Sequence, residues 1–291
     1  IEPSASLETY IKQEIRDRVQ EIRRNHGKPA KGQDNMLSVT NDLRKASLDL
    51  RLVKPEISAK EANGKVEAVG KLAADKYRET SDVDGAQLIF CDLSTPKGSS
   101  ENITESENLE AEDNENITVY DEIKKTLIKN GVPADQIAFV HDAKTKADLQ
   151  DLFEQVNEGH KRILIGSTAK MGAGTNCQKH LVALHHLDAP WRPRDIEQRE
   201  GRILRQGNDN KEVEIFTYVT KGSYDANMWE KLKNKAAIIS QAMSGNLASR
   251  VIDDADEAAL SYAEAEALAT DNPLMAEKTT VDANVTKYGL L

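Results

Sequence analysis

The sequence lacks the two features that would place the protein in a membrane or outside the cell. It has no run of about eighteen apolar residues, the length that a membrane-spanning helix needs. Its first residues, IEPSASLETYIKQEIRDR, lack the basic stretch followed by an apolar stretch of a signal peptide. We therefore expect a cytoplasmic protein without a membrane partner. Because the chain opens on Ile1 instead of Met, we also expect it to be part of a longer polypeptide.

Metal-binding and phosphate-binding patterns are missing as well. The chain has 2 cysteines, Cys91 and Cys177, and neither has a second Cys or a His at the spacing of a metal site. We expect free thiols packed in the interior, and no metal site. The phosphate loop GxxxxGK followed by Ser or Thr does not occur either.

Positive charge is scarce overall and unevenly placed. The net charge is -10, which argues against nucleic acid if the chain is taken whole. Residues 101 to 116 hold seven carboxylates and no base, whereas residues 159 to 207 hold nine Lys or Arg against four Asp or Glu. The basic residues therefore gather in one region, where a negatively charged ligand could bind.

From Lys65 onward, helical patterns alternate with short apolar strands, namely AQLIFCD, QIAFVH, RILIG, LVALHHLD and VEIFTYVT. This alternation predicts an α/β fold in which a parallel sheet carries helices on both faces. We expect this domain to span residues 65–222, between a helical lead-in at 1–64 and a helical extension at 223–291. The acidic stretch within 97–117 is too polar to pack and predicts a mobile surface loop.

The segment QREGRILRQG predicts a helix with two different faces. Pro193 suits a first helical turn and Gly207 suits a helix end, so the helix should cover residues 194–206. Its apolar residues should face the sheet; they are Ile196, Ile203 and Leu204.

The polar face of this helix should carry Gln198, Arg202 and Arg205, which are separated by four and three residues. Each arginine offers a planar fork of donors that matches phosphate oxygens and stays charged at any working pH. The spacing therefore indicates a polyphosphate site. A solvated stripe of charge on an ordinary helix is the alternative.

A second cluster, GSTAKMGAGTN at residues 166–176, directly follows the strand RILIG. Glycines at the carboxyl end of a parallel strand let the backbone approach a ligand closely, at the edge where such sheets place their sites. Because this cluster and the arginine helix follow consecutive strands, we expect them to converge on one cleft.

Three histidines carry no definite assignment. His185 and His186 lie side by side on LVALHHLD, so the alternation of a strand should turn one inward and the other outward. Packing or hydrogen bonding is the expected role of this pair, and His141 stays equally open.

The series AQLIFCD, GSTAKMGAGTN, HHLDAPWRPRDIEQREGRILRQG and VEIFTYVT resembles the second RecA-like lobe of superfamily-two helicases and translocases, closest to the Swi/Snf-type branch. In that family GSTAKMGAGTN corresponds to motif five, and the form QxxGRxxR to motif six. Arg192 stands where the Swi/Snf branch usually has Asn, which argues against a close remodeller. The strings DNML, HDAKT and ALSYAEAEALAT resemble the helicase portion of very large, in part methylase-associated, proteins of phages, plasmids and conjugative elements.

The resemblance implies roles for individual residues. Arg202 and Arg205 would be arginine fingers that stabilise charge on the ATP phosphates, and Gln198 would help order the cleft. The residues of motif five that would bind the nucleotide are Gly172, Gly174 and Asn176. The residues that would contact nucleic acid are Ser167, Thr168 and Lys170, with Ser94 at the position of motif four.

The sequence thus predicts the C-terminal motor lobe of an ATP-dependent DNA helicase or translocase, encoded by a bacterium or a phage. It would act with ATP and Mg on DNA, with duplex DNA preferred, together with an N-terminal RecA-like lobe of the same polypeptide. Without that lobe the chain should be inactive. The alternatives are an interaction module that keeps the fold without motor function, a nucleotide-binding transferase, and a plain α/β domain with a charged helix.

Overall fold

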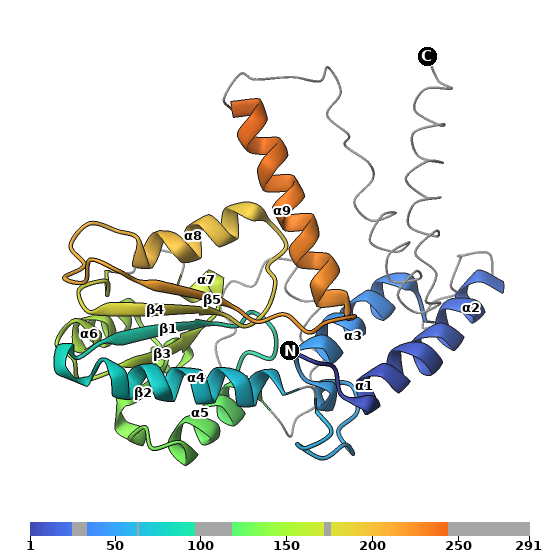
Figure 1. Cartoon of the computed structure of the whole chain (residues 1–291), viewed down its shortest axis with the longest axis horizontal. Coiled ribbons are helices and arrows are strands. Elements are labelled where there is room, and N and C mark those ends of the chain that lie inside the picture. The colour runs from blue at the N-terminus through green and yellow to red at the C-terminus, as the bar shows by residue number, and fades with distance from the viewer. Residues whose placement is uncertain (25–33, 63, 97–117, 172–175, 244–291) are drawn as a thin grey trace. The chain divides into compact units, whose positions relative to one another are not determined.

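The computed structural model describes residues 1–24, 34–62, 64–96, 118–171 and 176–243 (Figure 1). These residues form two compact units. One unit holds Ile1 and residues 64–219, and the other holds residues 2–62 and 220–243. The three-part division 1–64, 65–222 and 223–291 remains a prediction, and the predicted acidic loop lies outside the described residues.

The larger unit is built on a five-stranded sheet whose paired strands are all parallel, in the order β2-β3-β1-β4-β5. The predicted parallel α/β sheet is therefore confirmed. The strands are β1 (Ala86–Phe90), β2 (Ile137–Phe139), β3 (Ile163–Gly166), β4 (Leu181–His186) and β5 (Glu214–Thr217). In β1, β3 and β4 every residue is buried, which explains why they read as unbroken apolar runs instead of alternating ones.

Helices cover both faces of this sheet. They are α4 (Lys65–Glu79), α5 (Val119–Lys129), α6 (Lys146–Asn157), α7 (Thr168–Met171) and α8 (Pro193–Ile203), with short 3-10 turns η3 (Ser81–Val83), η5 (Ala134–Gln136) and η6 (Val140–Asp142). Figure 1 shows α8 over one face and α4 with α5 over the other. Leu88 and Phe90 of β1 pack in one core cluster with Phe153 of α6 and Ile203 of α8. On the opposite face, the Gln87 amide donates to the Ala73 carbonyl of α4 at 2.8 Å.

Arg162, which precedes β3, fastens the amino edge of the sheet to the end of α4. The buried guanidinium donates from Nε to the Gly85 carbonyl at 3.0 Å and from Nη2 to the carbonyls of Tyr77 and Thr80 at 2.8 and 3.0 Å. It also stacks on the Tyr77 ring, 4.1 Å from the centroid. A cation suits this place because the last carbonyls of a helix lack partners and carry partial negative charge.

Both histidines of β4 are buried, so the prediction that one of them points outward is wrong. Helices on both faces of a parallel sheet cover both sides of a central strand. Since the Gln87 amide nitrogen is already used, its oxygen accepts from Nε2 of His185 at 3.0 Å, and Nδ1 of His185 then accepts from the Tyr218 hydroxyl at 2.9 Å. His185 is thus a neutral ring held on both sides.

Burial lowers the pKa of His185 to about 3, so the folded chain cannot protonate this ring near neutral pH. An unfolded chain binds that proton, and stability therefore falls as the pH drops below about 6.5. Between pH 7 and pH 5 we expect His185 alone to cost about 2 kcal/mol of unfolding free energy. Urea unfolding at both pH values checks this: His185→Gln should remove that part of the pH dependence, and His160→Gln, at an exposed histidine, should keep it. An equal pH dependence in all three proteins would contradict the expectation.

The contact between α4 and α5 requires a glycine. A Cβ at Gly70 would overlap the Thr126 side chain, whereas a Cβ at Gly201 of α8 would meet nothing within 4 Å. We expect Gly70→Ala to destabilise the fold by about 1–3 kcal/mol through overpacking. Gly201→Ala should stabilise it by up to about 1 kcal/mol, because Ala favours helix more than Gly does. Chemical denaturation measures the unfolding free energy of both variants. Stabilisation by Gly70→Ala would contradict the expectation, because it would show that α4 and α5 can move apart to admit the methyl group.

The smaller unit is helical. Its described elements are α1 (Ala5–Thr9), the π-helical segment η1 (Tyr10–Ile15), α2 (Arg16–Arg24), α3 (Met36–Leu48), the 3-10 turn η2 (Leu50–Leu52) and α9 (Tyr224–Met243). α3 contacts both α2 and α9. The guanidinium of Arg18 in α2 pairs with Asp34 at 2.5 Å and with Asp42 of α3 at 2.7 Å. Within the described ranges, no helix has the length and apolar character that crossing a membrane would demand.

Candidate functional site

Polar residues follow three neighbouring strands at the carboxyl edge of the sheet. Asp92 lies just after β1, Ser167 and Thr168 follow β3, and Asp188 follows β4. Because β1 lies between β3 and β4 and all three are parallel, these residues meet at one edge. The carboxyl edge of the sheet therefore gathers polar residues from three strand ends.

A buried arginine of α8, Arg199, joins these strand ends. It is 0% exposed, and its Nε donates to the Thr168 hydroxyl at 2.7 Å. Nη2 donates to Asp92 at 2.7 Å and to Asp188 at 3.2 Å. Nη1 lies 3.0 Å from the Asp188 carbonyl and 3.4 Å from Nδ1 of His186. The five N–H donors of the guanidinium thus face five acceptors, which is what a fully buried arginine requires.

The two aspartates are fixed in turn by backbone and hydroxyl groups. Asp92 accepts from the Thr168 backbone N–H at 2.6 Å and from the Thr168 hydroxyl at 2.9 Å. Asp188 accepts from the backbone N–H groups of Asp92 and Leu93, at 2.6 and 2.8 Å. We call Asp92, Thr168, Asp188 and Arg199 the strand-end network.

Within the network, the charged forms of Asp92 and Arg199 are favoured. Burial alone would raise the pKa of Asp92, but the Arg199 charge and the bonds from Thr168 hold it below its ordinary value. Burial likewise opposes the charge on Arg199, yet Asp92 and Asp188 raise its pKa above the usual value. Each charge is therefore kept by its partners, as buried charges must be.

The sequence analysis missed Arg199 as a member of the site. One signal could have found it: Arg199 lies three residues after Ile196 and four before Ile203, so it shares the helix face that packs on the sheet. A charged residue on that face needs a buried partner, and aspartates at the ends of two strands were the available acids.

The structure brings together two residues predicted to bind nucleotide. Nη1 of Arg205 donates to the side-chain oxygen of Asn176 at 2.6 Å, and both residues are exposed. The end of the glycine-rich segment and the end of the arginine segment therefore meet. Gly172 and Gly174 lie outside the described residues.

Arg202 lies close to Arg205 and to the buried thiol of Cys177. Partial burial and the Arg205 charge lower the pKa of Arg202, in that order. Burial raises the pKa of Cys177 to about 12, so this thiol is neutral, and both cysteines are free and buried as predicted. Two cations held near each other form a place where an anion would relieve the repulsion between them.

The predicted helix over residues 194–206 is too long. α8 ends at Ile203, so Arg205 lies beyond the helix, and Leu204 is 62% exposed instead of facing the sheet. The Asn208 amide donates to the carbonyls of Leu181 and Ile203, at 2.9 and 3.4 Å. It thus gives the last carbonyl of α8 a hydrogen-bond donor. Gly207 then turns the chain with a φ of 90 degrees.

Two of the residues predicted to contact nucleic acid have hydrogen-bond partners inside the domain. Thr168 belongs to the strand-end network. The Ser94 hydroxyl is buried and accepts from the backbone N–H of Val119, the first residue of α5. This position near a helix N-terminus gives Ser94 a structural partner.

The other two residues lie at the carboxyl edge beside β2. The Ser167 hydroxyl is 3.4 Å from Nε2 of His141, and Lys170 is half-buried on α7. Burial, followed by the charge of Lys170, lowers the pKa of His141 to about 4. Lys170 thus adds positive charge near this edge.

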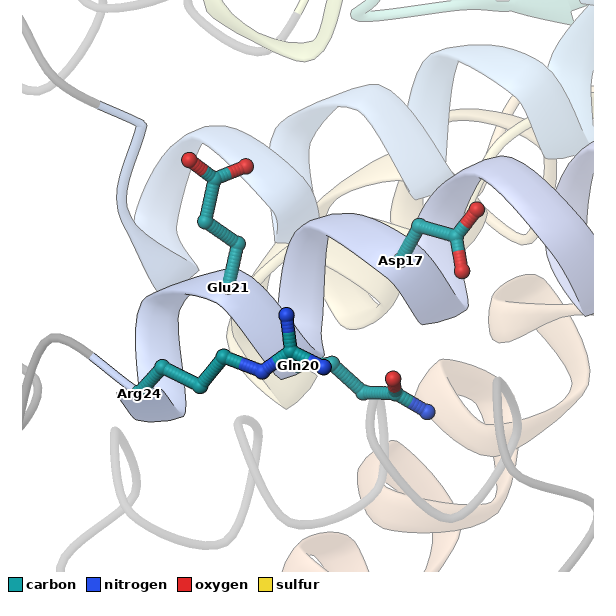
Figure 2. Close-up of a pocket in the computed structure, with 4 residues that line it drawn as sticks. All are labelled: Asp17, Gln20, Glu21 and Arg24. Carbon is teal, nitrogen blue, oxygen red and sulfur yellow. The ribbon is translucent and has the colours of Figure 1, made fainter.

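A cavity of about 460 Å³ lies against the smaller unit (Figure 2). Its described lining consists of Asp17, Gln20, Glu21 and Arg24, and all four side chains come from α2. These residues belong to no predicted motif and carry mixed charge, so we assign no chemistry to this cavity.

Residues 101–207 match the family of the helicase conserved C-terminal domain. This match includes the strand-end residues Thr168, Asp188 and Arg199 as well as Arg202 and Arg205. This region of the chain is therefore similar to helicase C-terminal domains.

Among curated proteins, the chain is similar to "Defense against restriction protein B" of Escherichia phage P1, with 32% identity over 109 residues. The similarity covers 38% of this chain and spans only 5% of the phage protein. Among solved structures, the C-terminal part of the Fun30 ATPase domain superimposes with a TM-score of 0.56 and 18% identity, over 79% of this chain and 86% of that one. The Hef helicase domain of Pyrococcus furiosus gives a TM-score of 0.48 and 11% identity, over 78% and 55%. The fold of the chain is RecA-like.

Proposed function

We propose that this chain is the C-terminal motor lobe of an ATP-dependent DNA helicase or translocase, and that Arg202 and Arg205 are its arginine fingers. The observation that carries the proposal is the 2.6 Å bond between Arg205 and Asn176, with Arg202 beside them. The bond places an exposed guanidinium beside an amide at the surface. Arg202 is near enough that, in addition to burial, the Arg205 charge lowers its pKa. These are groups that bind phosphate oxygens.

The chemistry follows from the two charges. During phosphoryl transfer, negative charge spreads over the oxygens of the transferred group, and a fixed guanidinium stabilises it without reorganising. Arg205 is held by Asn176 and stands outside the helix, where it can reach a neighbouring lobe. Gln198, on the same helix, would order this cleft.

The residues that the structure describes offer groups for the phosphates of ATP, and we assign the ligands of its magnesium ion elsewhere. Among the residues that the structure describes, no group of three or more His, Cys, Asp or Glu could hold a metal. When bound, Mg neutralises charge on the phosphates. We therefore assign its ligands and the phosphate loop to an N-terminal RecA-like lobe of the same polypeptide.

The proposed nucleic-acid contacts are Ser167, Thr168, Lys170 and Ser94. A half-buried lysine beside an edge of the sheet offers a phosphate contact that requires no particular base. Duplex DNA is the proposed substrate. The similarity to a phage protein supports a bacterial or phage protein of the mobile-element type.

The test is ATP hydrolysis by the natural full-length protein, with and without duplex DNA. We expect DNA to raise the rate, and the signal to be lost when the first lobe is deleted. A full-length protein that binds DNA but never hydrolyses ATP would be an interaction module with this fold. Hydrolysis stimulated by RNA alone would contradict the assignment to DNA.

A further inference from the structure

We propose that Arg199 is a positioning residue that holds α7 and α8 together. Through it, nucleic-acid binding at α7 changes the positions of the two arginine fingers, Arg202 in the last turn of α8 and Arg205 just beyond the helix. This inference rests on the proposed function and adds to it a route by which DNA regulates hydrolysis. It assigns that route to the strand-end network.

The carrying observation is the place of the Thr168 hydroxyl. It donates to Asp92 at 2.9 Å and accepts from Nε of Arg199 at 2.7 Å, so it lies directly between the two charges. Thr168 is the first residue of α7, which carries Lys170 and contacts α8. A shift of α7 would therefore break bonds to Arg199.

Arg199 transmits such a shift because all three nitrogens of its guanidinium have hydrogen-bond partners. Arg199 and Arg202 are separated by three residues of α8 and are therefore about one turn apart. The guanidinium cannot rotate without losing one of its five acceptors in a region that excludes water. α8 must then follow α7, and the two fingers move with it.

Stability alone gives no reason for this arrangement. Apolar residues of similar volume often replace a buried ionic group without loss of stability. Such a group therefore fixes the relative positions of the elements it joins more than it raises the free energy of unfolding. Here the geometry joins the segment with the proposed DNA contacts to the helix that leads to the fingers. That is the connection a DNA-stimulated enzyme needs.

The experiment measures coupling in the natural full-length protein. The affinity for duplex DNA is determined with and without a nonhydrolysable ATP analogue, and the ratio of the two dissociation constants is the coupling factor. In the wild type we expect a factor of about 5 to 150. In Arg199→Lys, which keeps the charge but loses the planar fork, and in Thr168→Val, it should fall to about twofold or less. Thr168→Ser restores the hydroxyl and should restore the coupling.

Arg162→Lys is the matched control. Arg162 is likewise buried, with three bonds to carbonyls, but it lies at the amino edge of the sheet. It should lower Tm much as Arg199→Lys does and leave the coupling factor as in the wild type. If Arg199→Lys fails to fold, the Thr168→Val and Thr168→Ser pair decides, because neither changes a charge.

Two results would overturn the inference in different ways. If the variants at Arg199 and Thr168 are folded and coupled like the wild type, the network is structural only, and the proposed motor function stands. If the wild type shows neither coupling nor DNA-stimulated hydrolysis, the proposed function itself fails and the inference fails with it.

Discussion

Arg205→Ala in the natural full-length protein is expected to lower the DNA-stimulated kcat for ATP hydrolysis by about 10³- to 10⁵-fold, the range known for arginine fingers. The side chain stands outside α8 and is exposed, so its loss should leave the unfolding free energy within about 0.5 kcal/mol. Catalysis and stability should therefore separate in this variant. Steady-state hydrolysis and chemical denaturation of the same preparation measure the two effects.

Two further variants sharpen the result. Arg205→Lys keeps a positive charge but offers no planar fork, so its rate should fall between those of the wild type and the alanine variant. Arg78→Ala removes an exposed arginine of α4, at the other edge of the sheet, and should hydrolyse ATP like the wild type. If Arg205→Ala raised KM and left kcat unchanged, Arg205 would contribute to ATP binding only. That result would exclude Arg205 as an arginine finger.

Asp188→Ala is expected to have the largest effect on stability, a loss of about 3–5 kcal/mol of unfolding free energy. Asp188 is 2% exposed, and it accepts from two backbone N–H groups and from Arg199. Alanine leaves those donors without an acceptor and leaves Arg199 with a single carboxylate, Asp92. Urea unfolding of the isolated chain measures the loss, provided that its transition is cooperative.

The controls for Asp188 separate its charge from its hydrogen bonds. Asp188→Asn keeps an oxygen that can accept from the backbone and should lose less than the alanine variant. Asp75→Ala removes an exposed carboxylate of α4 and should change stability by no more than about 0.5 kcal/mol. If Asp188→Ala were no worse than Asp75→Ala, the strand-end network would contribute nothing to the fold.

Local sequence was sufficient to predict most of the sheet. The runs RILIG and LVALHHLD are continuous and apolar because β3 and β4 are covered on both faces, and their alternation with helices specifies parallel strands. Pro193 does begin α8, and Gly207 has the positive φ expected near a helix end. The end of α8 was misjudged because Asn208 reaches back to Ile203, and helical periodicity does not register such a contact.

The sequence by itself determined the fold class, the cysteines as free thiols, and the two segments that meet where Arg205 bonds to Asn176. Only the tertiary structure decided that Arg199 is buried, that both histidines of β4 are covered, and that Thr168 and Ser94 turn their hydroxyls inward. Asp92 and Arg199 are separated by 107 residues in sequence. Periodicity shows which face of a helix is covered, but whether a charge on that face is tolerated depends on partners that only folding brings within reach.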